Sequence, residues 1–296
     1  MDWDKIRVFH AVAEAGSFTR AGETLNLSQS AVSRQISSLE EEVRIDLFHR
    51  HTRGLTLTEQ GEILFRTAHE MSAKLAITET LLSDASDNPK GELKITTTVG
   101  FGSTWLTPRL TDFLELYPDI TIHLVVDDRE LELGMGDADV AIRLREPVQA
   151  DLVRRRLVTV RNHIYASPEY LEKYGTPQSV EDLDHHHLIV YGDQAPSVLQ
   201  DVNWLMRVGS DGKNRRRPLV KVNNIYGGLR AAEAGVGIAS LPDYMILPEM
   251  RLIRILPESE GPSFDTYFVY PEELRKSKKI ALFRDFLIQK VAESEF

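Results

Sequence analysis

Hydrogen-bonding side chains gather on one short segment near the N-terminus: Gln29, Ser30, Ser33, Arg34 and Ser37. Their spacing places them on one face if residues 28–43 form a helix. Gln can pair with adenine, Arg with guanine, and Ser with a base or a phosphate. These residue types therefore suit a helix that enters the major groove of DNA. A solvent-exposed helix stabilised by ion pairs would carry Glu and Lys on this face instead.

Apolar residues at helical spacing predict three short helices that hold this polar face outward. The expected inward stripes are Ile6, Phe9, Val12 and Ala13 on the first helix, Phe18, Ala21 and Leu25 on the second, and Val32, Ile36, Leu39 and Val43 on the third. Gly16 ends the first helix, and Asn26-Leu27 forms the turn before the third. Ser17 and Ser28 are the expected N-caps of the second and third helices.

Two short strands are expected after these helices, at residues 47–50 and 55–57, around a turn at 51–54. Arg50 and Arg53 lie near the tip of this small wing, where they are candidate contacts to phosphates or to the minor groove. The alternative interpretation of residues 1–58 is a three-helix bundle whose polar face has no function.

The composition sets the general class of the protein. The 296 residues exceed one ordinary core and predict two or more folded units. No run of about 18 apolar residues appears, so no transmembrane helix is expected. The N-terminus lacks the layout of a signal peptide, and zero cysteines exclude disulfides and thiolate metal sites. We therefore expect a cytoplasmic protein.

The net charge of −10 argues against binding nucleic acid through bulk charge. Residues 1–58 carry 7 Lys and Arg against 8 Asp and Glu, which leaves that segment almost neutral. Affinity for DNA must then come from a few placed cations and helix ends, strengthened by dimerisation. The acidic remainder disfavours the alternative of a structural DNA-coating protein without sequence preference.

A long helix is expected from Thr58, its N-cap, to about Asp84. Its apolar positions alternate spacings of four and three residues: Leu64, Ala68, Met71, Leu75, Thr78 and Leu82. Such a stripe is typical of a coiled-coil seam and predicts pairing with a second copy of the chain. The alternative is that it packs only on its own chain. Residues 83–91 are polar with Pro and Gly, which indicates a hinge.

From residue 91 onward, short β-rich runs alternate with amphipathic segments. The expected strands are residues 93–97, 120–125, 139–142, 152–160, 188–191, 219–222 and 238–241, with helices at about 106–117 and 278–291. This alternation predicts an α/β fold with a mainly parallel sheet. About 206 residues of this pattern can form two subdomains, with the chain crossing between them twice.

The first strand ends in a segment suited to binding a small ligand. Ligands of open α/β sheets bind beyond the carboxyl ends of the strands, near helix N-termini. The candidate residues there are Thr98, Gly100, Phe101, Gly102, Ser103 and Thr104, faced by Asp127 and by Asn223 and Asn224. The glycines can equally serve only a tight turn, and Asp127 and Asp128 can be solvated. Two aspartates beside an anion site would favour an effector that also carries an amine.

Residues 9–40 resemble the winged helix-turn-helix of LysR-type transcriptional regulators almost position for position. Two positions depart from that family's pattern. Gly22 stands where Ala is usual, which should soften the second helix. Arg44 stands where Gly is usual, in a place that normally takes a left-handed backbone.

The remainder of the chain resembles the family's effector domain, which looks like a small periplasmic binding protein. The matching segments are residues 91–95, 117–120, 138–143, 166–171 and 231–242. The closest similarity is to the glycine-cleavage-activator-like branch. The resemblance implies domains at 1–58 (DNA-binding), 59–90 (linker helix and hinge) and 91–296 (effector-binding). In the last, subdomain I covers about 91–161 and 267–296, and subdomain II about 162–266.

The resemblance also implies partners and contacts. It predicts promoter DNA as partner, a dimer through the linker helix, a tetramer as a dimer of dimers, and contact with RNA polymerase. The effector is a small molecule of unknown identity, and no cofactor is expected. The implied DNA contacts are Ser17, Thr19, Arg20, Ser28, Gln29, Ser30, Ser33, Arg34, Ser37, Arg50 and Arg53.

Other features carry less information. The run His185-His186-His187 resembles a metal cluster, but adjacent residues cannot easily all face one ion, and we expect a loop. The run 215–217 (three Arg) suggests an exposed hairpin or a partner surface, and residues 154–156 (three Arg) flank an exposed strand. No Walker loop, nucleophile elbow or zinc-type His-Glu-x-x-His motif appears. An enzyme or solute-binding protein with an accessory DNA domain is therefore disfavoured, and no metal site is expected.

Overall fold

A computed structural model describes the chain except residues 1, 52–53, 84–88, 130, 132, 134–136, 150, 193–200, 210–215, 217 and 295. By its contacts the chain divides into two compact units, Met1–Thr80 with Gly134–Asp137, and Leu81–Leu133 with Ala138–Phe296. Within the described ranges, no helix combines the length and apolar character needed to span a bilayer.

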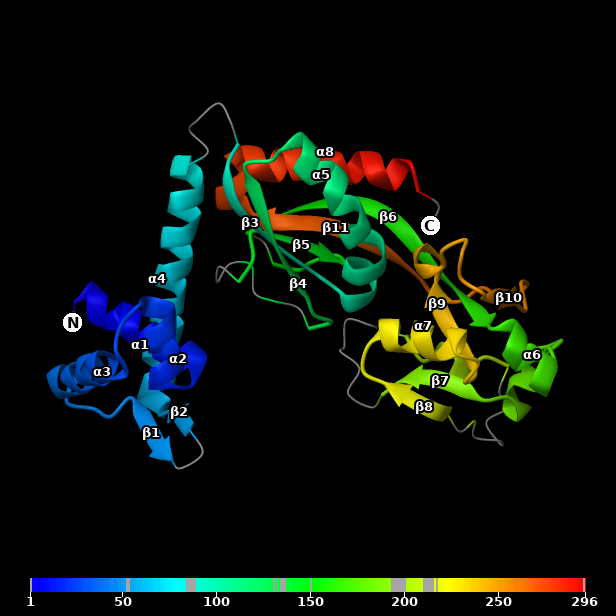
Figure 1. The fold of residues 1–296 in the computed structure, drawn as a ribbon, viewed down its shortest axis with the longest axis horizontal. Helices are drawn as coiled ribbons and strands as arrows, with labels where there is room; N and C mark the ends of the chain where they lie inside the picture. Colours follow the sequence, from blue (N-terminus) through cyan, green and yellow to red (C-terminus); the bar gives the residue numbers. More distant parts are fainter. Residues whose placement is uncertain are drawn as a thin grey trace. The chain divides into compact units, whose positions relative to one another are not determined.

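The N-terminal unit is a winged helix-turn-helix followed by a long helix (Figure 1). Its elements are α1 (Trp3–Ala15), α2 (Phe18–Leu25), α3 (Gln29–Val43), the wing strands β1 (Phe48–His51) and β2 (Gly54–Leu57), and α4 (Glu59–Ser83). The expected ends are confirmed: Gly16 closes α1 with φ 59°, and Ser28 caps α3 by accepting from the Ala31 N–H. Thr58 accepts from the Gly61 N–H at the start of α4.

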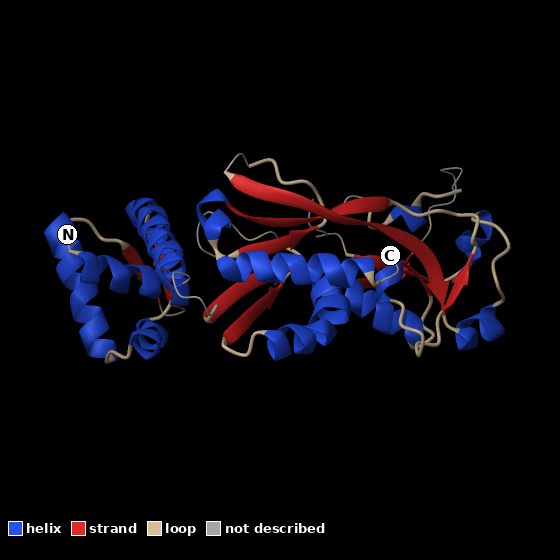
Figure 2. Ribbon diagram, turned by 90° about the horizontal axis from the view of Figure 1, so that it is seen from above, coloured by secondary structure: helices blue, strands red, loops and turns tan. Residues whose placement is uncertain are grey.

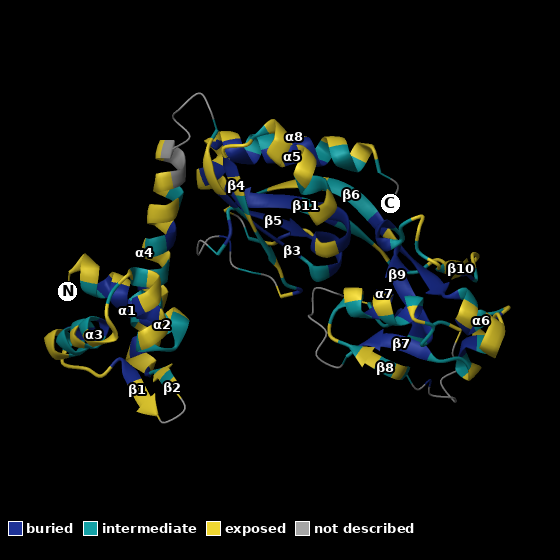
Figure 3. Cartoon of the chain, in the orientation of Figure 1, coloured by how far each residue is buried: buried dark blue, intermediate teal, exposed yellow. Residues whose placement is uncertain are grey.

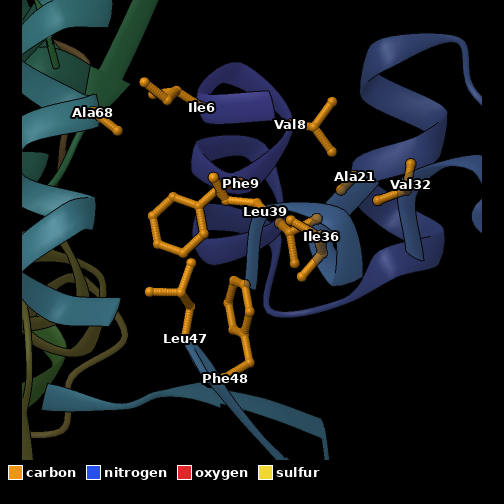
Figure 4. Packing of buried hydrophobic residues seen from close by; sticks show 11 residues of the cluster. Ile6, Val8, Phe9, Ala21, Val32, Ile36, Leu39, Leu47, Phe48 and Ala68 are labelled. Carbon is orange, nitrogen blue, oxygen red and sulfur yellow. The ribbon is translucent and has the colours of Figure 1, made fainter. Parts of the chain in front are cut away.

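The core of this unit forms around Phe9, which is fully buried (Figure 4). Its ring lies 5.3 Å from that of Phe48 in the wing. Ile36 and Leu39, both fully buried, close the core from α3. Burying each such side chain contributes about 2 kcal/mol, so the inward stripe of α3 fixes which face of that helix remains outside.

The apolar stripe of α4 divides into two parts. Leu64 and Ala68 pack on the core of the N-terminal unit. Met71, Leu75 and Leu82 are 39%, 46% and 71% exposed, and Figure 3 shows α4 mostly exposed beyond its first turns. The first part therefore packs on its own chain, whereas the second offers apolar surface for another partner.

The second unit is built on a sheet in which nine strands are described, in the order β4-β3-β5-β11-β6-β9-β7-β8, with β10 also paired to β6. The strands are β3 (Gly91–Thr97), β4 (Ile120–Val126), β5 (Val140–Arg143), β6 (Leu152–Ala166), β7 (Leu188–Tyr191), β8 (Pro218–Val222), β9 (Ile238–Pro242), β10 (Ile253–Ile255) and β11 (Ser263–Pro271). The long strand β6 belongs to both halves, so it joins two subdomains.

The expectation of a mainly parallel sheet is wrong. β3 is parallel to β4 and β5, and β7 is parallel to β8 and β9. The strands that connect the halves pair antiparallel: β11 with β5 and β6, and β6 with β9 and β10. Each half thus has three parallel strands, and every antiparallel pair described in this sheet involves β6 or β11.

Helices cover the sheet of the second unit (Figure 2). They are α5 (Leu110–Leu116), α6 (Pro168–Tyr174), α7 (Ile225–Glu233) and α8 (Lys278–Ala292). The ring of Phe113 on α5 lies 5.2 Å from those of Phe283 and Phe286 on α8. Ahead of α5, a π-helix (Phe101–Leu106) occupies the region expected to be a turn, and a 3₁₀ turn (Thr107–Arg109) forms the start of the expected helix.

Candidate DNA-binding surface and effector cleft

The polar face of α3 is solvent-accessible while its apolar face is buried. Ser28, Gln29, Ser30 and Arg34 are exposed, and Ser33 and Ser37 are half-buried. On the opposite face Val32, Ile36 and Leu39 are fully buried. The wing and α2 leave this face open to solvent, which is the geometry that major-groove insertion requires.

The remaining candidate DNA contacts surround α3. Thr19 and Arg20 are exposed at the start of α2, and Ser17 precedes it in extended conformation without a side-chain capping bond. Ser28 Oγ lies 3.1 Å from Ser30 Oγ, so the two hydroxyls share a hydrogen bond at the N-terminus of α3. That end of the helix favours an anionic group such as a phosphate.

Of the two arginines predicted to contact DNA from the wing, the structure describes Arg50. Arg50 donates to Glu40 Oε2 at 3.2 Å, and its guanidinium lies 5.5 Å from the centre of the Phe18 ring. With about half of its side chain exposed, Arg50 is held in position and still reaches solvent. Arg53 lies outside the described residues.

The two departures from the family pattern each have a structural explanation. Arg44 does take the left-handed conformation, with φ 58° and ψ 34°, as the C-cap of α3. At Gly22, an added Cβ would lie 2.6 Å from the carbonyl oxygen of Leu27. The missing methyl therefore lets the turn before α3 pack closely on α2.

The second unit contains a cavity of about 350 Å³ between the two halves of its sheet. Thr98 at the end of β3, Asn162 on β6 and Ile225 at the start of α7 line it. Its further described lining is Asp128, Leu144, Arg145, Glu146, Asp201, Val202, Pro242, Tyr244, Pro262, Ser263, Phe264, Asp265 and Tyr267. A cavity of this size with a few convergent polar groups suits a small metabolite.

Two buried polar atoms in this lining lack a partner among the described residues, Thr98 Oγ1 and Asn162 Oδ1. Asn162 is only 6% exposed. Leaving such an atom unpaired costs about 1–3 kcal/mol. Both atoms are therefore available to hydrogen-bond a ligand that enters the cavity.

The lining is predominantly acidic. The described part holds Asp128, Glu146, Asp201 and Asp265 against Arg145. Asp128 accepts from the Tyr191 hydroxyl at 2.9 Å and from the Val99 N–H at 3.0 Å. The Arg156 guanidinium beside Asp265 holds the pKa of that carboxyl below its usual value. Arg154, Arg207 and Arg156 pair with Glu146, Asp201 and Asp265. Asp128 is therefore the lining carboxylate best placed to attract a positive group on a ligand.

Only part of the sequence-predicted effector site lies at this cavity. Thr98 lines it, and Gly100 packs against Ile225 and Tyr244, which also line it. Phe101, Gly102 and Thr104 are buried, and Ser103 is exposed; these four are not among its described lining residues. Thr104 donates to the carbonyl oxygen of Gly100 within its own helix.

The polar residues expected to face this turn are also engaged elsewhere. Asp127 pairs with Arg129 at 2.7 Å, and that hydrogen bond lowers the pKa of Asp127. Asn224 caps α7 by accepting from the Gly227 N–H at 2.7 Å, and Asn223 is exposed beside it. Sequence reasoning missed Asn162, because β6 also carries Arg, Thr and His side chains and one more polar residue in it gives no signal.

The expectation that the three arginines at 215–217 are exposed is wrong at Arg216. Arg216 is 4% exposed, so this arginine is not part of an exposed surface. Its guanidinium donates to Asp184 Oδ1 and to the carbonyl oxygens of Val180, Leu205 and Val208, each at 2.6 Å. Arg215 and Arg217 lie outside the described residues.

A winged helix-turn-helix with an open polar helix, joined to a two-lobed α/β domain with a ligand-sized cavity, defines a ligand-responsive DNA-binding regulator. Residues 3–62 match the family described as bacterial regulatory helix-turn-helix protein, lysR family. Residues 86–292 match the LysR substrate binding domain. The chain belongs to the LysR family of transcriptional regulators, which are not enzymes.

Known members of the family are similar to this protein over nearly all of its length. The transcriptional regulator CrgA of Neisseria meningitidis serogroup C is 32% identical over 98% of this chain and 97% of its own. A solved structure of CrgA from Neisseria meningitidis has TM-score 0.60 at 29% identity, covering 98% and 99% of the two chains. The Vibrio cholerae virulence activator AphB has TM-score 0.63 at 26% identity, covering 98% and 99%.

Proposed function

We propose that the protein recognises promoter DNA by inserting α3, its recognition helix, into the major groove. Gln29, Ser33 and Arg34 read bases, while Ser30, Arg50 and Arg53 hold the backbone. The remaining predicted contacts, Ser17, Thr19, Arg20, Ser28 and Ser37, flank this surface. The observation that carries the proposal is the exposed polar face of α3 backed by a fully buried apolar face.

We further propose that the protein works as a dimer and binds an interrupted palindrome as a dimer of dimers. The exposed apolar residues Met71, Leu75 and Leu82 on α4 support pairing between copies. Contact with RNA polymerase and a cytoplasmic location follow from this role as expectations. The domain limits proposed are those expected from the sequence: 1–58, 59–90 and 91–296, the last divided at about 161 and 267.

For the effector, we propose a small molecule that carries an amine and a hydrogen-bonding group. Buried Asp128 in the cavity lining supports the amine, and the unpartnered atoms of Thr98 and Asn162 support the hydrogen bonds. Binding would shift the relative population of two arrangements of the DNA-binding units. CrgA and AphB carry other names than the glycine-cleavage-activator-like branch, so that finer assignment stays a prediction.

The DNA proposal is tested by recovering the genomic fragments that the full chain binds and sequencing them. We expect a shared interrupted palindrome, and gel-shift affinity for it that falls steeply with salt. Recovery of fragments without a common sequence would contradict base reading by α3.

The effector proposal is tested by thermal shift of the full chain with amino acids, aliphatic amines and dicarboxylates. We expect an amine-bearing compound to raise the melting temperature. Thr98→Val should leave the ligand-free protein at least as stable, because the hydroxyl has no described partner, and should reduce the ligand-induced shift. Ser103→Ala is the matched control and should not alter it. A rise in melting temperature produced only by dicarboxylates would contradict the proposal that the effector carries an amine.

A further inference from the structure

Three side chains with metal-binding groups meet where α1 packs on α4: His10, Glu14 and His69. His10 Nε2 lies 2.8 Å from His69 Nδ1. Glu14 Oε1 lies 3.7 Å from the first of these nitrogens and 3.8 Å from the second. One ligand atom from each residue therefore lies close to the other two. The three residues belong to α1 and α4 and are not part of the polar face of α3.

The regular spacing of residues on α1 and α4 brings these three side chains together. His10 and Glu14 are four residues apart, so they share one face of α1. His69 follows Ala68, which is buried in the contact with the core. The ring of Phe65, one turn before His69, lies 5.4 Å from that of His10 and 5.5 Å from that of His69. Phe65 thus covers one side of the imidazole pair.

Burial of the three residues is uneven in a way that suits an ion. The side chains of His10 and His69 are 13% and 15% exposed, whereas that of Glu14 is 52% exposed. The imidazoles are fixed by packing and the carboxylate lies at the solvent side. An ion would therefore enter past Glu14 and meet two nearly dry nitrogen ligands.

The distances fit a tetrahedral ion after small adjustments. Zinc binds imidazole nitrogen and carboxylate oxygen at about 2.0–2.2 Å, which places tetrahedral ligand atoms about 3.3 Å apart. The observed separations of 2.8, 3.7 and 3.8 Å lie on both sides of that value. Side-chain rotations that move these atoms by about half an ångström would bring all three separations to the tetrahedral value.

We propose that His10, Glu14 and His69 bind a divalent transition-metal ion such as Zn²⁺, with a fourth position open to water. Two imidazoles and one carboxylate are ligands that zinc prefers. Since α1 carries the DNA-binding core and α4 carries the linker, the ion clamps the contact between them. Metal binding therefore stabilises the N-terminal unit by mass action.

The competing explanation for the same contact is a hydrogen bond between the two imidazoles with a nearby carboxylate. It accounts for the 2.8 Å distance between His10 and His69. It requires no ion and gives no role to Glu14 in binding one. The two explanations differ in their dependence on Glu14, which makes Glu14→Gln the decisive variant.

The experiment uses the full chain, freed of metal with a chelator and dialysed. Co²⁺ is titrated while its visible absorption is followed, and Zn²⁺ is then added as a competitor. We expect one tightly bound ion per chain in the wild type. Affinity should fall more than about tenfold in Glu14→Gln and His69→Gln, because even outer-shell partners of metal ligands are worth about that much.

The His185–His187 run supplies the control. Its imidazoles do not form a metal-ligating group among the described residues, and His187→Gln should bind Co²⁺ as the wild type does. Glu14 is exposed, so Glu14→Gln should fold normally, which circular dichroism in chelator verifies. Zn²⁺ should raise the melting temperature of the wild type and not of Glu14→Gln. Equal binding by the wild type and Glu14→Gln, or loss of binding in His187→Gln, would overturn the proposal.

Discussion

Arg50 in the wing donates a hydrogen bond to Glu40 on the recognition helix, with 3.2 Å between Nη2 and Oε2. The other carboxylate oxygen of Glu40 accepts from the backbone N–H groups of Leu47 and Phe48, at 2.9 and 3.3 Å. One side chain therefore fixes where the wing leaves the recognition helix and also orients a cation of the wing.

Glu40→Ala should lower the free energy of unfolding by about 1–3 kcal/mol, because two backbone donors of buried residues lose their acceptor. Denaturant unfolding of the full chain measures the change. Glu41→Ala is the matched control, since Glu41 is the exposed neighbour on the same helix, and it should be nearly neutral. Equal effects of the two substitutions would show that Glu40 does not fix the wing.

The C-caps of α1 and α3 make a second, paired prediction. Gly16 and Arg44 have nearly the same left-handed φ, 59° and 58°. A left-handed backbone costs a residue with a Cβ about 1–2 kcal/mol. Arg44→Gly should therefore raise the free energy of unfolding by about 1 kcal/mol, and Gly16→Ala should lower it similarly. Changes of the same sign in denaturant unfolding would refute this assignment.

Arg216 should be among the most sensitive positions of the effector domain. Arg216→Ala removes four hydrogen bonds and leaves Asp184 and three carbonyl groups without their donor. We expect a loss of about 3–5 kcal/mol, measured as a fall in the melting temperature. Arg216→Lys should not restore it, because an ammonium cannot reach the same fork of acceptors. A melting temperature unchanged by Arg216→Ala would contradict these contacts.

Asp139 provides a pH-dependent prediction. Burial raises the pKa of this carboxyl, and the Lys94 N–H, Lys279 and Lys94 partly oppose the shift while Glu92 adds to it. The folded state thus holds its proton more tightly than the unfolded chain, so the contribution of Asp139 to stability falls as pH rises through that window. Asp139→Asn should be more stable than wild type near neutral pH, with the difference vanishing below about pH 4. A difference that grows on acidification would contradict the sign.

The N-terminal unit was predictable because its determinants are local. The caps at Gly16 and Ser28 and the stripe through Ile36 and Leu39 act within a few residues of the chain. The wing strands β1 and β2 begin only a few residues after α3, so they too are specified by nearby sequence. Arg44 was the exception, since its type does not reveal its left-handed backbone.

The effector cavity was less predictable because its residues meet only after folding. The glycines after β3 appeared suited to a ligand, yet they serve close packing: a Cβ at Gly100 would lie 2.5 Å from Ile225 Cγ2, and one at Gly102 would lie 2.3 Å from Val126 Cγ1. Asn162 reaches the same cavity as Thr98 from a strand 64 residues away in the chain. No local pattern specifies that meeting.

The central claim is that the recognition helix reads bases through Arg34. The most direct measurement is the affinity of wild type and Arg34→Ala for the recovered palindrome and for single-base variants of it, at one salt concentration, with Arg275→Ala in the effector domain as control. Wild type and Arg275→Ala should lose about 1–3 kcal/mol at one position of each half-site, and Arg34→Ala should lose that preference while its melting temperature is unchanged. An unaltered base preference in Arg34→Ala would contradict the account.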